Sequence, residues 1–391
     1  MASVLLDLTP LVAASTLRGI GRYVRGLVKG LEELGPDQWQ GLEIRGLAAA
    51  DALDRLLPPI ERLSEYTERP PKTPVKNCNI IRSKLVTFQF VRAARDAGAN
   101  LVHLSEPKGI ALSRDPIITV TSLDLIVLAM KHLYLPPIPG WSIMYRGLEH
   151  LRYKSAKRII AISEATKRDL VELLGFDPNR IEVAYLGVDH ERFRPEPVEN
   201  EAIRVHEFLG SDAPYIVYFG AGDARKDLDT LVSAHARVAS QGIRLVFAGH
   251  LSPVRRQKLE QLAVQLGTRE SVNFAGFVAE DLVPALYRQA AVHVFPSRYE
   301  GFGLPVLEAL ACGTPTITSP GSSLDEVAGD AAEIVPCGEP EALAVALERV
   351  LSDSELQGKM RQRGLSRARE FTWQNCAKTT LKFWTRALAE G

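Results

Sequence analysis

The sequence predicts an α/β protein built from two doubly wound domains, in which helices cover both faces of a parallel sheet. Short apolar runs alternate with amphipathic helical patterns along the chain, and this alternation is typical of parallel strands connected by helices. The chain has 391 residues, more than one hydrophobic core usually supports, so two domains are expected. Hydrophobic residues make up 46% and charged residues 24%, which excludes a disordered chain.

Six strands are expected in each half of the chain. The apolar runs of the first half span 4–8, 43–47, 100–104, 116–121, 158–162 and 181–186. Those of the second half span 215–219, 243–248, 272–275, 292–295, 314–318 and 332–335. Between the halves lies a linker rich in proline and glutamate, 194–201, which interrupts regular structure. The proline-rich stretch 49–75 is expected to hold a helix and an irregular loop.

Composition also indicates the compartment. The first residues lack a basic region, and Asp7 and Pro10 interrupt their apolar stretch, so no signal peptide is expected. No apolar run approaches the roughly 18 to 20 residues of a membrane span. The four cysteines are scattered without metal-ligand spacing, and we therefore expect a cytoplasmic protein.

Charge is balanced overall but uneven along the chain. Residues 1–195 carry 27 Lys and Arg against 22 Asp and Glu, and the remainder carries 20 against 25. Four cations recur at three- or four-residue steps on one face of an expected helix over 19–34: Arg18, Arg22, Arg25 and Lys29. A solvated helix face is the favoured interpretation. Peripheral attraction of this basic half to an anionic membrane surface, or to an anionic acceptor, is the alternative. The pI near 7.1 and the lack of a nucleic-acid-binding motif argue against a nucleic-acid partner.

The most informative stretch begins at the expected strand 292–295. A glycine-rich turn containing Gly301 and Gly303 follows this strand and opens a helix. Free backbone N–H groups at the start of that helix can hold a phosphate or a sugar oxygen. Glu300 precedes the turn and Glu308 lies one turn into the helix. Because a carboxylate accepts two hydrogen bonds at once, both glutamates suit the vicinal hydroxyls of a sugar.

A second anion site is expected in the loop 220–227. The loop follows a strand and precedes a helix, so helix N–H groups point at any bound anion. Arg225 can bind phosphate oxygens in bidentate fashion and Lys226 supplies a compact charge. Both suit a diphosphate whose negative charge grows as a glycosidic bond breaks. The alternative, an ordinary cationic helix start, is disfavoured because the helix dipole repels cations there.

The first half contains weaker candidates. Gly19-Ile-Gly21-Arg22-Tyr23 opens a helix and either contacts a phosphate or an acceptor or forms a plain tight turn. It lacks the spacing and the acidic residue of a dinucleotide fingerprint, which argues against a nicotinamide oxidoreductase. His103 lies near the carboxyl end of a strand, where open sheets bind ligands; a structural histidine is the alternative. Ser163 and Glu164 are expected to cap a helix.

The Glu300-x7-Glu308 pattern resembles the signature of retaining glycosyltransferases of family 4, which have the GT-B fold. The resemblance continues through 156–195, 220–234, 274–297, 321–332 and 369–380, so it covers most of the chain from about residue 100 onward. It implies two Rossmann-like domains facing a central cleft. These are 1–194, joined by a returning helix 372–391, and 195–371.

The family resemblance also implies roles for the candidate residues. Glu308 binds the ribose of a nucleoside diphosphate sugar, Glu300 binds the sugar hydroxyls, and Arg225 and Lys226 stabilise the departing diphosphate. The remaining donor contacts fall on two glycine-containing segments: Gly19 and Gly21, and Gly301, Phe302, Gly303 and Leu304.

Relatives commonly carry a histidine where this chain has Leu123, so Asp124 or Ser122 is expected to supply that polar contact. Arg22 and His103 are weaker candidates for the acceptor or the sugar.

The loops resemble the branch that transfers mannose and rhamnose in bacterial polysaccharide synthesis, which favours GDP-mannose as donor. UDP- and dTDP-sugars remain alternatives, and the acceptor is expected to be a saccharide or a lipid-linked saccharide. No cofactor or metal is expected, because no Asp-x-Asp motif is present where another transferase fold would carry it. A protein that binds sugar nucleotides without catalysis is the competing interpretation.

Overall fold

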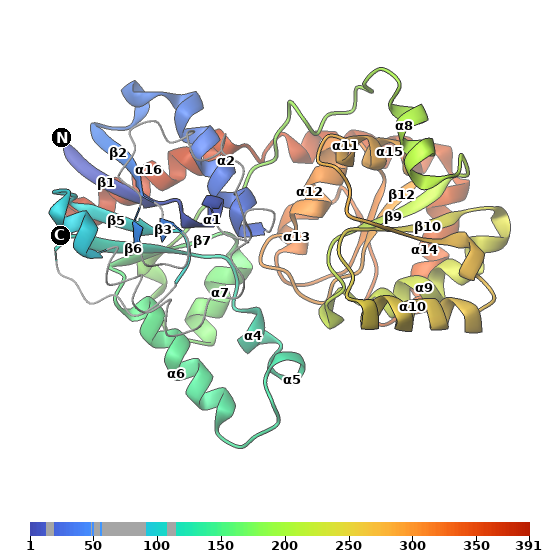
Figure 1. Ribbon diagram of the computed structural model, residues 1–391, viewed down its shortest axis with the longest axis horizontal. Helices are drawn as coiled ribbons and strands as arrows, with labels where there is room; N and C mark the ends of the chain where they lie inside the picture. Colours follow the sequence, from blue (N-terminus) through green and yellow to red (C-terminus); the bar gives the residue numbers. More distant parts are fainter. Residues whose placement is uncertain (13–18, 48, 51–54, 57–90, 108–114) are drawn as a thin grey trace. The chain divides into compact units, whose positions relative to one another are not determined.

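The computed structural model describes residues 1–391 except 13–18, 48, 51–54, 57–90 and 108–114. The chain divides into two compact units (Figure 1). Unit 1 comprises Met1–Gly187 and Phe371–Gly391, and unit 2 comprises Val188–Glu370. The domain boundary expected at 194 lies seven residues beyond the end of the first part of unit 1 (194 against 187).

Unit 1 contains a six-stranded sheet in the order β2-β1-β5-β6-β7-β8, and all its described pairings are parallel. Every strand expected in this half is present within a few residues. The strands are β1 (Ala2–Asp7), β2 (Leu42–Leu47), β5 (Leu101–Leu104), β6 (Ile117–Ser122), β7 (Arg158–Ala161) and β8 (Ile181–Val183). They are almost wholly buried, as expected for a sheet covered on both faces.

The helices of unit 1 fill the connections between these strands. The expected helix over 19–34 is confirmed as α2. The described helices are α1 (Thr9–Val12), α2 (Gly19–Leu34), α4 (Ile126–Ala129), α5 (Lys131–Tyr134), α6 (Trp141–Lys154), α7 (Glu164–Glu172) and the 3₁₀ helices η2 (Pro36–Gln38) and η5 (Pro178–Arg180). Ser163 caps α7 by accepting a hydrogen bond from the Thr166 amide at 3.0 Å, as predicted.

The sequence prediction for 49–75 lies mostly outside the described residues. The part that is described forms a short antiparallel pair, β3 (Ala49–Ala50) and β4 (Arg55–Leu56). Arg18 and Cys78 are also outside the described ranges.

The C-terminal helix α16 (Trp373–Ala389) belongs to unit 1 and packs against α2. Two glycines of α2 make this contact possible. A Cβ atom at Gly26 would lie 2.1 Å from the Trp373 ring, and one at Gly30 would lie 2.2 Å from the Trp373 carbonyl oxygen. At its other end, Glu390 accepts a hydrogen bond from Arg158 at 3.0 Å. The helix is therefore attached to unit 1 along its length.

Unit 2 contains a second parallel sheet of six strands in the order β11-β10-β9-β12-β13-β14. This is the strand order of a doubly wound nucleotide-binding fold. The strands are β9 (Tyr215–Phe219), β10 (Arg244–Ala248), β11 (Val272–Gly276), β12 (Val292–Phe295), β13 (Thr316–Thr318) and β14 (Glu333–Ile334). The expected α/β fold with two doubly wound sheets is confirmed.

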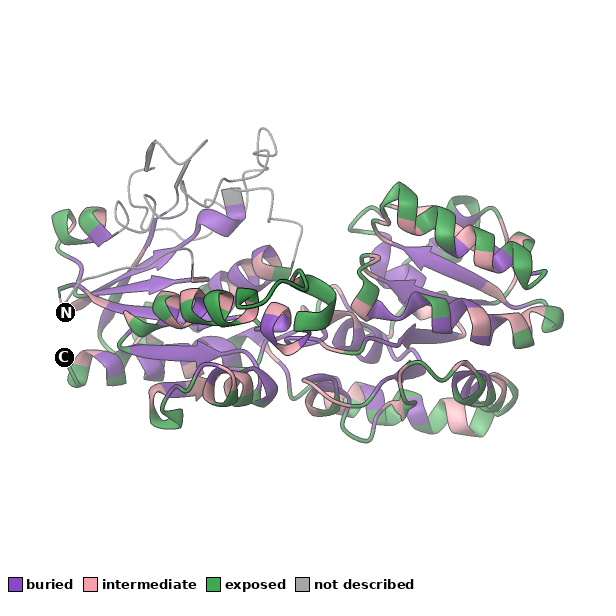
Figure 2. Cartoon of the chain, turned by 90° about the horizontal axis from the view of Figure 1, so that it is seen from below, coloured by how far each residue is buried: buried purple, intermediate pink, exposed green. Residues whose placement is uncertain are grey.

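Helices cover the sheet of unit 2, and Figure 2 shows its strands buried between partly exposed helices. The helices are α8 (Glu201–Leu209), α9 (Leu228–Val238), α10 (Pro253–Gln265), α11 (Val283–Gln289), α12 (Leu304–Ala311), α13 (Leu324–Ala328), α14 (Pro340–Ser352), α15 (Ser354–Ala368) and the 3₁₀ helices η6 (Ala224–Lys226), η7 (Ala239–Gln241) and η8 (Arg269–Ser271). Among the described residues, no helix combines the length and the apolar character needed to cross a membrane.

Candidate functional site

The candidate site lies where the strand order of the second sheet reverses. β9 and β12 are neighbours there, with Val292 opposite Ile216 and His293 opposite Val217. The chain leaves β9 toward the sheet edge on one side and leaves β12 toward the other, so the loops after these strands diverge. In open parallel sheets such a point forms a ligand-binding crevice at the carboxyl ends of the strands. Both anion loops predicted from the sequence, 220–227 and 296–303, start there.

Three side chains converge on one oxygen of Glu300. Its Oε1 accepts hydrogen bonds from Lys226 Nζ at 2.5 Å, from Ser297 Oγ at 2.5 Å and from Arg225 Nη1. The Glu300 residue is 8% exposed. Two cations thus share one carboxylate, and Arg225 Nη2 also lies 3.8 Å from the exposed carboxylate of Asp223.

Packing holds the two cations in place. Arg225 also donates to the Tyr299 carbonyl oxygen at 2.9 Å. Lys226 is buried, and its Nζ lies 4.4 Å from the centroid of the Phe295 ring, where the ring face attracts a cation. Burial lowers the pKa of Lys226, although Glu300 opposes this shift. Burial raises the pKa of Glu300, but Lys226 and Arg225 outweigh it, so the pKa lies below its usual value and the carboxyl is ionised.

Asp227 fixes the end of the cationic loop. This residue has a left-handed backbone (φ 52°) and immediately precedes α9. Its carboxylate accepts hydrogen bonds from Arg298 Nη2 at 2.8 Å and from the Gly338 amide at 2.6 Å. The Arg298 side chain is 44% exposed but is paired with Asp227.

Two serines hold the turn that follows Glu300. Ser322 Oγ accepts from the Glu300 amide at 3.1 Å, and Ser323 Oγ donates to the carbonyl oxygens of Glu300 and Phe302 at 2.9 and 2.8 Å. Both serines therefore hold the backbone of the turn.

Gly303 allows the turn to enter α12. It has φ 106°, and a Cβ there would lie 2.8 Å from Leu324 Cδ2, so other residues would be strained. Gly301 and Phe302 are buried beside it, and Leu304 begins the helix half-buried. No side chain caps this end of α12. The amides of the first helical turn therefore point toward the carboxyl edge of the sheet.

Glu308 lies on the buried side of α12 and is 4% exposed. Tyr287 Oη donates to Glu308 Oε2 at 3.3 Å. Glu308 and Glu300 therefore occupy different surroundings, since only Glu300 contacts the two cations.

Comparison with protein families agrees with this geometry. A model described as "Glycosyltransferase Family 4" matches residues 17–192, and one described as "Glycosyl transferases group 1" matches residues 199–367. Together the two models cover most of both units, and β1 and α16 lie outside them. The chain belongs to glycosyltransferase family 4.

Curated relatives of this glycosyltransferase include mannosyltransferases. It is 30% identical over 235 residues to O-antigen chain mannosyltransferase B of Escherichia coli, a match that covers 59% of this chain and 61% of the relative. It is 27% identical over 276 residues to the serotype-specific mannosyltransferase WbdA of Escherichia coli, covering 68% of this chain and 33% of the relative. The matched part is thus less than two thirds of either relative.

Solved structures show the same fold over the full length. Sucrose-phosphate synthase from Thermosynechococcus elongatus superposes with a TM-score of 0.77 at 20% identity, covering 100% of both chains. HepE of Anabaena, in complex with UDP and glucose, superposes with a TM-score of 0.72 at 16% identity, covering 98% of this chain and 99% of that chain. The predicted GT-B fold is confirmed.

The remaining candidate residues belong to unit 1. Gly19 and Gly21 occupy the first turn of α2, and Arg22 follows half-buried. Asp124 is exposed after β6, and its carboxylate accepts from the Ile126 amide at 3.1 Å. Leu123, in the place of the family's histidine, is half-buried.

His103 has a structural role in this glycosyltransferase, which corrects its assignment as a sugar contact. Its ring is fully buried, and its Nδ1 and Nε2 lie 2.9 Å from the hydroxyls of Thr119 and Thr121. Thr121 also hydrogen-bonds Tyr23 Oη at 2.8 Å, which links α2 to β6. Burial lowers the pKa of His103 to about 3, so the imidazole is neutral. No atom of it is accessible to a sugar.

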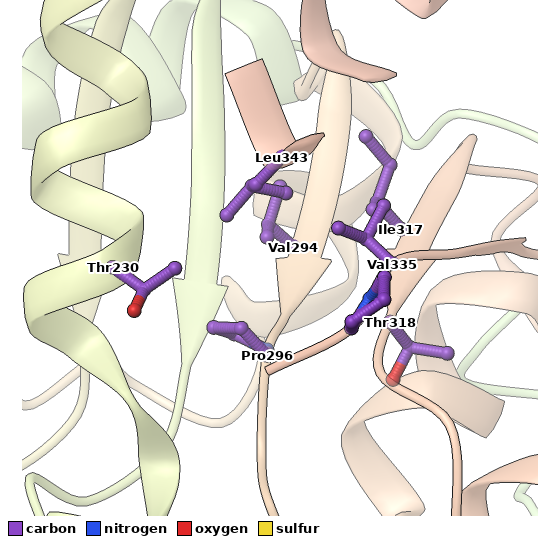
Figure 3. A pocket seen from close by; sticks show the side chains of 8 residues that line it. Thr230, Val294, Pro296, Ile317, Thr318, Val335 and Leu343 are labelled. Atoms are coloured by element: carbon purple, nitrogen blue, oxygen red, sulfur yellow. The ribbon is translucent and has the colours of Figure 1, made fainter. Parts of the chain in front are cut away.

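A small pocket between the sheet of unit 2 and helices α9 and α14 is distinct from the charged cluster. Figure 3 shows side chains that line this pocket from β12, β13, α9 and α14. The lining consists of Thr230, Val294, Pro296, Ile317, Thr318, Val335, Pro336 and Leu343. The lining contains no charged side chain, so it cannot neutralise a diphosphate.

Sequence reasoning missed Ser297 and Asp227, which hold Glu300 and the cationic loop. Short polar residues beside a turn are usually capping residues. Ser297 instead donates to Glu300 three residues ahead, and Asp227 accepts from Arg298 and Gly338, which lie far along the chain. The only available signal was that both residues stand in loops that follow buried strands.

Proposed function

We propose that this protein is a retaining hexosyltransferase that moves mannose from GDP-mannose to a hydroxyl of a saccharide or lipid-linked saccharide. The observation that carries the proposal is the Arg225–Lys226–Glu300 cluster at the switch point of the second sheet. Two nearly buried cations next to a helix N-terminus suit a nucleoside diphosphate.

In the proposed complex, Arg225 and Lys226 bind the diphosphate, assisted by the amides of Gly301 and Phe302 before α12. Glu300 binds the sugar hydroxyls through Oε2, because Oε1 already accepts three hydrogen bonds. Glu308 receives the ribose diol. Since each carboxylate is confined by buried partners, the donor meets a preorganised site.

The proposed chemistry is a front-side substitution at the anomeric carbon. The bond from this carbon to the phosphate oxygen breaks while the bond to the acceptor oxygen forms on the same face. The acceptor proton passes to the leaving phosphate. Arg225 and Lys226 stabilise the charge that develops on the diphosphate, which is an electrostatic role that needs no metal ion. We therefore propose metal-independent catalysis.

The donor assignment rests on the mannosyltransferases among the relatives. HepE binds UDP and glucose, which keeps a UDP-sugar as the second candidate.

We place the reaction in the cytoplasm at the inner face of the membrane. The unpaired cysteines Cys312, Cys337 and Cys376 agree with a reducing compartment.

The test has two stages. First, thermal unfolding is measured with GDP, UDP, ADP and dTDP, because ligand at about 100 times its Kd stabilises the protein by about 2.7 kcal/mol. Second, the corresponding sugar nucleotides are incubated with candidate acceptors, with and without EDTA, and the anomeric configuration of the product is determined by NMR. An inverted product, a metal requirement or a UDP preference each refutes a separate part of the proposal.

Variants distinguish catalysis from mere binding. Arg225→Ala and Lys226→Ala should lower turnover by at least a hundredfold, whereas the control Arg256→Ala should not. Arg256 forms an exposed pair with Glu260 at 3.0 Å on the same unit. If the wild-type protein binds nucleotide but transfers no sugar to any acceptor, the non-catalytic alternative replaces the proposal.

A further inference from the structure

Unit 1 carries an exposed apolar segment that the transfer reaction does not use. It consists of α5, the turn 135–140 and the first half of α6, and we call it the 131–147 surface. Six large apolar side chains within it are 37% to 76% exposed: Leu133, Tyr134, Ile138, Trp141, Ile143 and Met144. Figure 1 shows α6 extending away from the sheet of its unit, with this turn at its far end.

The C-terminal half of α6 anchors the segment to unit 1. Only Glu149 and Tyr153 of this helix are buried. Tyr153 Oη hydrogen-bonds Ser122 Oγ at 2.9 Å, and Glu149 accepts from Arg152 at 2.5 Å. Tyr145 also packs partly buried against the described core, whereas the six large apolar side chains at 133–144 are exposed.

The charge of the segment is one-sided. From Leu125 to Leu148 the chain contains no aspartate or glutamate. Lys131 and Arg146 are exposed within it, and Lys154 is exposed at the end of α6. The first acid after it, Glu149, is buried and paired with Arg152. Exposed apolar side chains are thus accompanied only by exposed cations.

We propose that the 131–147 surface binds the interface of an anionic lipid bilayer. Ile138, Ile143 and Met144 would enter the boundary between headgroups and acyl chains, where Trp141 and Tyr134 also prefer to lie. Lys131 and Arg146 would contact the anionic headgroups, whose attraction adds to the apolar burial. The three prolines of the turn, Pro136, Pro137 and Pro139, restrict its backbone and reduce the entropy lost on binding.

This inference deepens the proposed function and rests on the membrane location proposed there. Vesicle binding requires neither a donor nor an acceptor, so its failure is distinguishable from a failure of the transfer reaction. It also narrows the membrane attraction expected from the sequence, which concerned the basic first half of the chain and the cationic face of α2, to one surface of unit 1. Among the described residues of that face, Lys29 lies 3.7 Å from Glu33, and the surrounding α2 side chains are largely buried.

The test is sedimentation of the full chain with vesicles of phosphatidylcholine containing 30 mol% phosphatidylglycerol. We expect binding that weakens with salt and with removal of the anionic lipid, together with a blue shift of Trp141 fluorescence that is lost in Trp141→Phe. The double variant Ile143→Glu/Met144→Glu should reduce the partition coefficient at least tenfold, about 1.4 kcal/mol.

Val264→Glu is the matched control. Val264 is 62% exposed on α10 of unit 2, so this variant adds a negative charge at an exposed apolar position elsewhere and should bind vesicles like the wild type. Unchanged binding of the double variant, or no binding of the wild type to anionic vesicles, overturns the proposal. Lipid-free dimerisation that the double variant abolishes, without any vesicle binding, would instead make this surface a protein interface.

Discussion

Replacing Glu300 with glutamine tests the candidate site most directly. The substitution keeps the size of the side chain and removes the negative charge that Arg225 and Lys226 share. The side chains of all three residues are nearly buried, with exposures of 11%, 12% and 8% for Glu300, Arg225 and Lys226. Solvent therefore cannot replace the lost carboxylate. Removing one partner of a buried pair costs about 3–5 kcal/mol, and we expect unit 2 to lose stability in this range.

The control is Glu280→Gln. Glu280 pairs with Arg192 at 3.3 Å, and the two side chains are 49% and 31% exposed. Exposed pairs contribute at most about 1 kcal/mol. The same chemical change should therefore have a much smaller effect at this position.

The stability of unit 2 in both variants is measured by urea denaturation followed by hydrogen exchange, because peptides covering β9 and β12 report on unit 2 separately from unit 1. We also expect Glu300→Gln to bind free nucleoside diphosphate at least as tightly as the wild type while losing transfer activity, since the phosphate site becomes more positive. If Glu300→Gln and Glu280→Gln are equally stable, the cluster does not behave as a buried ion pair. If nucleotide affinity falls tenfold, the cations do not face the diphosphate.

Three further predictions concern other parts of the molecule. Glu308→Ala should weaken nucleoside diphosphate binding by roughly 10- to 150-fold in calorimetry, because a charge-assisted pair contributes about 1.5–3 kcal/mol. Between pH 7 and pH 5 each unit should lose about 2 kcal/mol of stability, because burial lowers the pKa of His103 and His293 from 6.5 to about 3 and only the unfolded chain gains the proton in that range. Gly30→Ala should destabilise the packing of α16 by about 1–3 kcal/mol, because the added methyl group meets the Trp373 backbone; circular dichroism during thermal unfolding measures the loss.

Each of these has its own control. Affinity unchanged by Glu308→Ala would move the ribose contact to another residue. His293→Leu should reduce the pH dependence of unit 2 between pH 5 and 7, while His235, whose pKa burial also lowers, keeps its own contribution; an unchanged slope would implicate other groups. Gly358→Ala adds a methyl group where no atom lies within 4 Å, so it should be neutral or slightly stabilising; an equal loss in both glycine variants would exclude the contact with Trp373 as the cause.

The sequence alone was enough to predict the helices and strands, because each of them is indicated by residues that lie close together in the chain. A buried strand in a parallel sheet is a short apolar run, and the twelve runs all became strands of the two six-stranded sheets. Helix starts were equally visible: Gly19 begins α2, and Pro305 occupies the first turn of α12. The Glu300-x7-Glu308 spacing and the family resemblance were read from the chain in the same way.

The side chains that contact each candidate site residue could not be predicted in this way, because they come from segments that are distant in the sequence. Glu300 meets Lys226 because β9 and β12 are adjacent in the sheet, although 74 residues separate the two side chains. The sequence could not decide whether His103 is a structural histidine or binds a ligand. The structure decides this, because Thr119 and Thr121 hydrogen-bond both of its ring nitrogens.

By itself, then, the sequence determined the α/β class, the order of the elements and the loops that can hold an anion, because hydrophobic period, glycine and proline act over a few residues. Only the tertiary structure decided which polar groups are buried together and which apolar ones stay exposed. Ile143 and Met144 are as apolar as the core residues of α2, yet no described element covers them. Burial depends on which faces meet in the folded chain, and that information is absent from any short window of sequence.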